Sequence, residues 1–253
     1  MSKTTKGHLQ TLDGVQLAYT RTIGQTPGIV FLGGFRSDMT GIKALALEKF
    51  CQENNKSFIR FDYRGHGAST GSFEESTITT WTLDTLSVID SLTEGPQILV
   101  GSSMGGWIML LAALAIKSIV AGLVGIATAT DFTQRLLDRE LNKKQLTELK
   151  TAGITHIYSP YSETPYAFTQ SLLDDGKRHL LLHEQIDLHC PVRLLHGMSD
   201  TSVNWRHSLE LANALTTHDV ETTLLKDGDH RLSDPRSISC LLKTVETLIH
   251  DKM

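Results

Sequence analysis

Cysteine is scarce in this sequence, and so are long apolar runs. Three cysteines stand far apart among 253 residues, at positions 51, 190 and 240. An odd number at such spacing is typical of free thiols in a reducing compartment rather than of a disulfide framework. The longest apolar run, Trp107 to Ile116, is well short of the ~18 residues that a membrane-spanning helix needs. The composition, with 40% hydrophobic and 21% charged residues, is that of a globular protein.

A large excess of positive charge is also absent. The formal net charge is -4, so the sequence offers no electrostatic field for nucleic acid or an anionic membrane. The 11 histidines include no H-E-x-x-H pattern and no close Cys/His ligand pattern, so no metal site is expected. The stretch from Met1 to Gly7 is polar, and no basic segment leads into an apolar one. We therefore expect a cytoplasmic protein with no metal, no nucleic-acid partner and no membrane span.

Strands alternate with helices along most of the chain. Lys6 to Leu12 and Val15 to Ile23 flank an Asp-Gly turn, which predicts an antiparallel hairpin. The later strands are expected at residues 28–32, 57–63, 96–100, 119–127, 191–196 and 220–225, and helices at 40–54, 78–92, 205–215 and 235–250. Strands that alternate with helices are typical of a parallel, doubly wound sheet. The predicted fold class is therefore α/β, with a mostly parallel sheet, an antiparallel N-terminal hairpin and a single domain over 1–253.

One stretch combines a strand, a sharp turn and a helix around a serine. Apolar residues 96–100 lead into Gly101-Ser-Ser-Met-Gly105, and an apolar segment of helical length follows. A reversal this tight forces its central residue into a strained backbone conformation, so the residues two positions away must lack side chains. Ser103 has a glycine on both sides at that distance, whereas Ser102 has none. The G-x-S-x-G frame predicts a nucleophile elbow centred on Ser103, although an ordinary loop also matches this pattern by chance.

A serine hydroxyl needs a base, and the base needs an orienting carboxylate. Because parallel strands end at one edge of a sheet, the loops after later strands can supply both groups. The strand expected at 191–196 leads to Asp200, and the strand expected at 220–225 leads to His230. The order serine, acid, histidine is that of the α/β-hydrolase arrangement. We predict Ser103 as nucleophile, Asp200 as acid and His230 as base.

Other side chains near strand ends compete for these roles. His66 and His196 also follow or end expected strands, and His196 is interpreted as a support for the turn before Asp200. Asp227 and Asp229 are too close to His230 along the chain to orient its ring, so they are interpreted as turn residues. The glycine loop at 64–69 lacks the G-x-x-x-x-G-K-[ST] pattern and is interpreted as scaffold rather than as a phosphate site.

An oxyanion hole needs two backbone N–H donors that are placed before the reaction. Met104 follows the nucleophile directly, at the start of the expected helix. The second donor is expected in the loop after the strand at 28–32, where Gly33-Gly34 lets the backbone approach the substrate. We predict the amides of Met104 and Phe35 as the two donors.

Together these motifs resemble the α/β-hydrolase superfamily. The strings that carry the resemblance are Gly33-Gly34-Phe35, Arg64-Gly65-His66-Gly67-Ala68-Ser69, the elbow, His196-Gly197-x-x-Asp200 and Gly228-Asp229-His230. Residues 73–77, 95–103 and 193–198 are similar, more narrowly, to a group of acyl-glucuronide esterases and mitochondrial palmitoyl-protein thioesterases. Two features depart from these patterns: many members have His-Gly where this chain has Gly33-Gly34, and no organelle presequence precedes Gly7.

The resemblance implies an α/β-hydrolase fold that cleaves carboxylic esters, acyl thioesters or acyl glucuronides without a cofactor. The partner would be a small acyl ester or thioester, or an acylated protein. Two alternatives use the same triad, a peptidase of the proline-iminopeptidase type and a carbon–carbon hydrolase. A third alternative is a catalytically silent binding protein, because a fold alone does not determine a function.

The segment at 128–190 breaks the alternation of strands and helices. Ordinary strand–helix connections take ~2–6 residues, whereas this segment offers no readable strand of the main sheet. The apolar face that includes Phe132 needs a surface to cover, so we expect a helical cap over the sheet edge above Ser103. A peripheral insertion on the flank of the domain is the alternative. Arg135 and Arg139 either face an anionic leaving group or are solvated.

Overall fold

The computed structural model describes residues 3–158 and 163–250. Within this part of the chain, eight strands form one sheet in the order β1-β2-β4-β3-β5-β6-β9-β10. Their bounds are Thr4–Gln10 (β1), Gln16–Thr22 (β2), Gln25–Leu32 (β3), Lys56–Phe61 (β4), Gln97–Ser102 (β5), Val120–Ile126 (β6), Val192–Gly197 (β9) and Val220–Leu225 (β10). The β1–β2 and β2–β4 pairs are antiparallel, and the other pairs are parallel.

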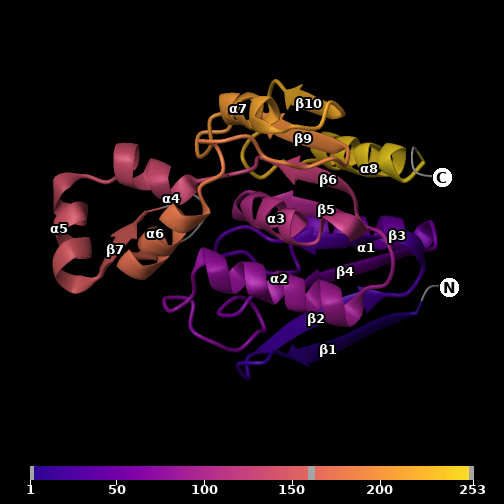
Figure 1. Ribbon diagram of the computed structural model, residues 1–253, viewed down its shortest axis with the longest axis horizontal. Coiled ribbons are helices and arrows are strands. Elements are labelled where there is room, and N and C mark those ends of the chain that lie inside the picture. Colours follow the sequence, from indigo (N-terminus) through magenta and orange to yellow (C-terminus); the bar gives the residue numbers. More distant parts are fainter. Residues whose placement is uncertain (1–2, 159–162, 251–253) are drawn as a thin grey trace.

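Helices cover both faces of this sheet (Figure 1). The helices α1 and α8 lie on one face, and α2, α3 and α7 lie on the other. Their bounds are Ile42–Glu53 (α1), Ile78–Leu92 (α2), Met104–Ala115 (α3), Arg206–Ala214 (α7) and Pro235–His250 (α8). The predicted α/β class, with its antiparallel start and mostly parallel sheet, is confirmed.

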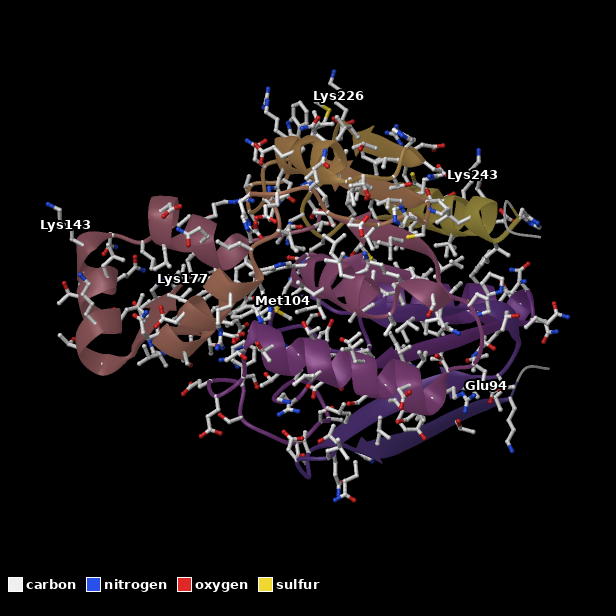
Figure 2. The ribbon with its side chains drawn as sticks, viewed as in Figure 1. Glu94, Met104, Lys143, Lys177, Lys226 and Lys243 are labelled. Carbon is white, nitrogen blue, oxygen red and sulfur yellow. The ribbon has the colours of Figure 1, made fainter. Side chains whose placement is uncertain are left out.

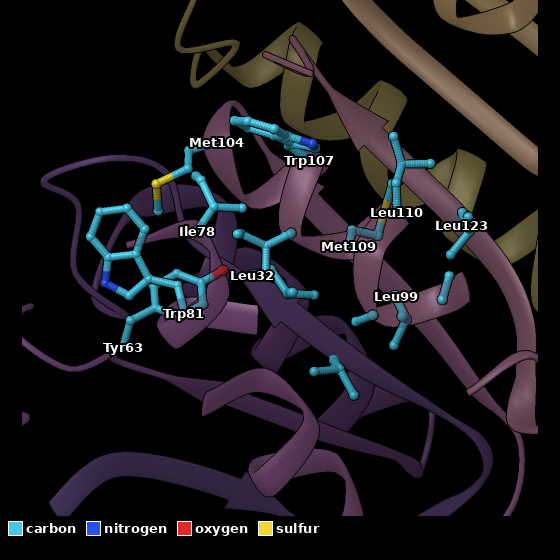
Figure 3. Packing of buried hydrophobic residues seen from close by; sticks show 14 of the residues in the cluster. Leu32, Tyr63, Ile78, Trp81, Leu99, Met104, Trp107, Met109, Leu110 and Leu123 are labelled. Carbon is cyan, nitrogen blue, oxygen red and sulfur yellow. The ribbon is translucent and has the colours of Figure 1, made fainter. Parts of the chain in front are cut away.

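The central strands bury both of their faces, which explains their continuous apolar sequences. In β3, Ile29 and Phe31 pack into the cluster with α1 and α8, while Val30 and Leu32 pack into the cluster with α2 and α3. The second cluster contains two fully buried tryptophans, Trp81 and Trp107. Figure 3 shows the first residue of α3, Met104, between the side chains of these helices. The end of β5 and the start of α3 are therefore anchored in the core.

Residues 132–158 and 163–179 form a lobe that extends from one end of the sheet (Figure 1). Its elements are α4 (Phe132–Arg135), the π-helical turn η2 (Leu136–Glu140), α5 (Lys143–Ala152), β7 (Ile154–Ile157), β8 (Tyr166–Thr169), α6 (Gln170–Gly176) and η3 (Lys177–His179). The strands β7 and β8 pair with each other in a separate antiparallel sheet. The sequence predicts helices here but not this hairpin, because four-residue strands are too short to show a clear alternation. In Figure 2, Lys143 projects from the far end of the lobe, and Met104 lies near the junction with the main body.

Candidate active site

Ser103 lies between β5 and α3 in a strained backbone conformation. Its φ is 54° and its ψ is -120°, in a region that residues with a side chain rarely adopt. A Cβ atom on Gly101 would lie 2.4 Å from the carbonyl oxygen of Gly105, and one on Gly105 would lie 2.2 Å from the carbonyl oxygen of Leu32. The two glycines therefore allow strand and helix to approach closely, while Ser103 itself carries the strain.

Three predicted side chains form a hydrogen-bonded chain at the carboxyl edge of the sheet. The Oγ atom of Ser103 lies 3.1 Å from Nε2 of His230. Nδ1 of His230 lies 2.7 Å from Oδ2 of Asp200. Asp200 follows β9 and His230 follows the neighbouring strand β10, so parallel pairing brings the two loops together. The structure thus brings the three residues together, although His230 lies 127 residues after Ser103 and 30 residues after Asp200 in the sequence.

Asp200 is buried and accepts hydrogen bonds at both carboxylate oxygens. Oδ1 accepts from the amides of Ser202 and Val203, each at 2.8 Å. Oδ2 accepts from His230 and also lies 3.1 Å from Nε2 of His196. Burial alone raises the pKa of Asp200, but the hydrogen bonds from His196 and His230 outweigh it and hold the pKa well below its ordinary value. Asp200 is therefore ionised at neutral pH.

The two predicted oxyanion donors flank the nucleophile. A Cβ atom on Gly34 would lie 3.4 Å from Cβ of Ser103, so the loop that carries Phe35 passes directly beside Ser103. Neither the Phe35 amide nor the Met104 amide donates a hydrogen bond to another described residue. An N–H group of this kind is ready to bind an oxyanion without first breaking a protein contact. The role of both amides stays a prediction.

Aromatic rings from the main body and from the lobe meet around Phe35. The ring of Phe35 stacks on Phe168 with the centroids 4.9 Å apart and an interplanar angle of 5°. It also meets Phe132 edge-on at 5.8 Å, and Phe132 contacts Trp107 in turn. The further ring contacts of Phe35 are to Phe73, Trp81 and Tyr166. The lobe therefore places an apolar surface beside the residue that follows Gly34.

Two aspartates fasten the lobe to the main body. The carboxylate of Asp131 accepts from the amides of Leu181 and Leu182, which brings the two ends of the lobe together. The carboxylate of Asp175 accepts from the amide and the hydroxyl of Thr79 in the first turn of α2, each at 2.8 Å. Burial raises the pKa of Asp175, but the hydrogen bonds from Thr79, together with those from Arg178 and Thr77, outweigh this effect and lower the pKa overall.

The remaining predicted candidates lie elsewhere. Asp227 and Asp229 are exposed, and Asp229 accepts from the amide of Leu232 within its own turn. Arg135 is close to the ring of His207, with Nη2 2.6 Å from Nδ1. The side chain of Arg139 lies outside the described residues.

Sequence reasoning missed one residue near the catalytic loops. The ammonium group of Lys43, in the first turn of α1, donates to the carbonyl oxygen of Arg231, which follows His230. Burial lowers the pKa of Lys43 to about 8. The sequence contains no motif that links Lys43 to the turn after His230, 188 residues away.

Two properties of the described residues bear on the class of site. No group of three or more His, Cys, Asp or Glu side chains in this part of the chain could hold a metal ion. Nor is any helix within it long and apolar enough to cross a membrane.

Comparisons with known proteins identify the relatives of this chain. The profile of the Alpha/beta hydrolase family matches residues 29–187. A bovine relative, "Palmitoyl-protein thioesterase ABHD10, mitochondrial", is 44% identical over 99% of this chain and 82% of its own length. A solved structure of mouse alpha/beta hydrolase domain-containing protein 10 is 42% identical, with a TM-score of 0.92 over 98% of this chain and 100% of the other. A hydrolase from Agrobacterium vitis is 38% identical, with a TM-score of 0.93 over 98% of this chain and 99% of the other.

The expected cytoplasmic location is wrong by this comparison. The curated relatives from cattle, mouse, orangutan, human and rat are all named mitochondrial. The polar residues 1–7 are weaker evidence for the cellular location than relatives that match over nearly the whole chain.

The predicted enzyme class, a hydrolase of esters or thioesters, is confirmed by this kinship, although the kinship does not identify the substrate. The profile match covers more than half of the sequence, and the curated relatives match almost all of it. The chain belongs to the alpha/beta hydrolase family, in the group of the ABHD10 thioesterases.

Proposed function

We propose that this enzyme hydrolyses acyl thioesters, and esters of the same acyl groups, through an acyl-enzyme on Ser103. The observation that carries the proposal is the chain of contacts Ser103–His230–Asp200 beside two amides that bind no other described residue. A hydroxyl, an imidazole and a carboxylate in this order form a nucleophile, its general base and the group that orients the base.

The reaction follows from these positions. Oγ of Ser103 attacks the acyl carbonyl carbon while its proton passes to Nε2 of His230. The oxyanion that forms accepts from the amides of Met104 and Phe35, and the negative charge of Asp200 stabilises the imidazolium. The carbon–sulfur or carbon–oxygen bond then breaks, and the leaving group takes the proton from His230. Water repeats the sequence, which releases the carboxylic acid and returns the proton to Ser103.

The aromatic surface around Phe35 supports a long apolar acyl group. Phe132 and Phe168 come from the lobe and Phe35 from the main body, so an acyl chain beside Ser103 would contact both. Burying each CH₂ group contributes ~0.8 kcal/mol, which favours long chains over short ones. The segment 128–190 thus acts as a cap that contributes to substrate choice. The name of the mammalian relatives, palmitoyl-protein thioesterase, agrees with a long acyl chain on a protein or on a small thiol.

An acyl glucuronide is a second candidate substrate, favoured by Arg36. Arg36 follows Phe35 directly, and its exposed guanidinium lies over the ring of Phe73 at 3.9 Å from the centroid. A cation at this position can meet the carboxylate of a glucuronate leaving group.

The decisive experiment uses a fluorophosphonate probe on the parent protein and two serine variants. Ser103→Ala should abolish labelling and lower turnover by roughly 10⁴-fold to 10⁶-fold, because the nucleophile is lost. Ser102→Ala is the matched control and should retain substantial activity. Equal labelling of both variants would refute the assignment of the nucleophile.

A substrate panel then separates the classes. A palmitoyl thioester, p-nitrophenyl esters of increasing chain length, an acyl glucuronide and a proline p-nitroanilide would be compared by kcat/KM. The highest value is expected for the palmitoyl thioester. A protein that labels with the probe but prefers the anilide would instead be a peptidase, and one that neither labels nor hydrolyses would be a binding protein.

A further inference from the structure

His196 is a second histidine in contact with the carboxylate of Asp200. It lies at the end of β9, and its side chain is fully buried. Its Nε2 atom lies 3.1 Å from Oδ2 of Asp200 and 3.0 Å from the carbonyl oxygen of Val203. Its Nδ1 atom lies 2.6 Å from the hydroxyl of Ser208 in α7. Both ring nitrogens therefore have polar partners.

The partners define which nitrogen of His196 carries the proton. The carbonyl of Val203 and the ionised carboxylate of Asp200 can only accept, so Nε2 must be the N–H donor. The hydroxyl of Ser208 can donate, so Nδ1 can be the acceptor. A neutral ring with its proton on Nε2 satisfies all three contacts at once, which a ring with its proton on Nδ1 cannot do.

Oδ2 of Asp200 therefore accepts from two imidazole rings. His230 donates from the side of the nucleophile, and His196 donates from the buried side of the loop. A neutral donor adds no net positive charge, so the charge of the carboxylate remains available to His230 when it takes the serine proton. A hydrogen bond to a charged, buried acceptor is among the stronger ones in proteins.

We propose that His196 is a positioning residue, which holds the carboxylate of Asp200 toward His230 as a neutral ring with its proton on Nε2. Ser208 fixes this tautomer from the opposite side of the ring. The inference rests on the proposed function, since Asp200 acts on His230 only within that mechanism.

The activity test compares His196→Gln with His196→Leu. The amide nitrogen of glutamine can replace Nε2 as a donor to Asp200, whereas leucine has a similar size and no donor. We expect kcat of His196→Leu to fall roughly tenfold to hundredfold with little change in KM, because Asp200 loses one of its donors. His196→Gln should recover most of that loss. Parent-like turnover of His196→Leu, or an equal loss in both variants, would show that the ring acts only by packing.

A second measurement does not depend on turnover or on a variant at His196. In protein labelled with ¹⁵N-histidine, NMR should show the His196 proton on Nε2, and Asp200→Asn should shift the resonances of both His196 and His230. A proton on Nδ1, or a His196 resonance unchanged by Asp200→Asn, would overturn the inference. A parent protein that neither labels nor hydrolyses would refute the proposed function, and the NMR result would still decide the state of His196.

Discussion

The carboxyl edge of the sheet and the lobe hold their residues in different ways. At the edge, the backbone does the positioning, and five of the six non-glycine residues with positive φ lie in the loops after β3, β5, β6 and β10. These residues are Arg36, Ser103, Ala127, Asp131 and Leu232. Within residues 132–158 and 163–179 of the lobe, no residue other than Gly153 has a positive φ. The lobe is fastened by side chains such as Asp175, and it contacts Phe35 through aromatic rings.

This difference separates the chemistry from the choice of substrate. Strained loops persist only where the surrounding structure over-determines them, and here that structure is a sheet buried on both faces. The lobe's aromatic contacts are each worth only ~0.5–1.5 kcal/mol beyond the area they bury. We therefore expect substitutions at the edge to stop the reaction and substitutions in the lobe to change which acyl group is preferred.

The largest effect is expected for Asp200→Asn. An asparagine presents an N–H group where His230 needs an acceptor, which favours the wrong tautomer of the base, so turnover should fall roughly 10⁴-fold. Asp227→Asn and Asp229→Asn are the controls, because both side chains are exposed and Asp229 accepts from the amide of Leu232 in its own turn. Steady-state kinetics with one p-nitrophenyl ester would test all three. Near-parental turnover of Asp200→Asn, together with a large loss in either control, would mean that the acid is misassigned.

The same difference explains what the sequence could predict. Ser103, Asp200 and His230 each follow a strand that is apolar enough to be recognised, and parallel strands end at one edge. His196 was interpreted only as a support for the turn before Asp200, because no motif shows that its ring contacts that carboxylate. Asp131, at the base of the lobe, and Asp175, within it, accept hydrogen bonds from partners 50 and 96 residues away, and no local pattern encodes such contacts.

The lobe can be tested at Phe132. Its ring is half-buried and contacts Phe35 and Trp107, so Phe132→Ala should open space beside the acyl group. We expect the ratio of kcat/KM for long and short p-nitrophenyl esters to change several-fold, with only a small fall in Tm. Leu137→Ala, in the same segment of the lobe, is the control. Unchanged chain-length selectivity with a lower Tm would place Phe132 in the structural core and count against a cap over the acyl group.

The smallest effect on turnover is expected from a buried histidine in the main body, whose contribution is to stability. His66 is 4% exposed, and burial lowers its pKa from 6.5 to about 4, with the charge of Arg36 acting in the same direction. The unfolded chain therefore binds a proton between pH 6.5 and 4 that the folded chain does not. Stability rises with pH wherever the unfolded state binds more protons, so His66 destabilises the fold progressively as the pH falls from 6.5 to 4.

Replacing His66 should make the stability of the fold depend less on pH, while the turnover of the enzyme stays unchanged. In His66→Phe the new ring would pack near Phe73 and Trp81, and the carbonyl of Arg64 keeps its bond from Nε1 of Trp81 at 3.3 Å. Urea unfolding at pH 7.5 and pH 5 would compare the two proteins. The phenylalanine ring does not titrate, so on going from pH 7.5 to pH 5 the free energy of unfolding should fall by about 2 kcal/mol less in the variant than in the parent. An equal loss of stability in both proteins on acidification would show that His66 is protonated in the folded state. The acid sensitivity would then come from other groups such as His207, because burial also lowers the pKa of His207 to about 4.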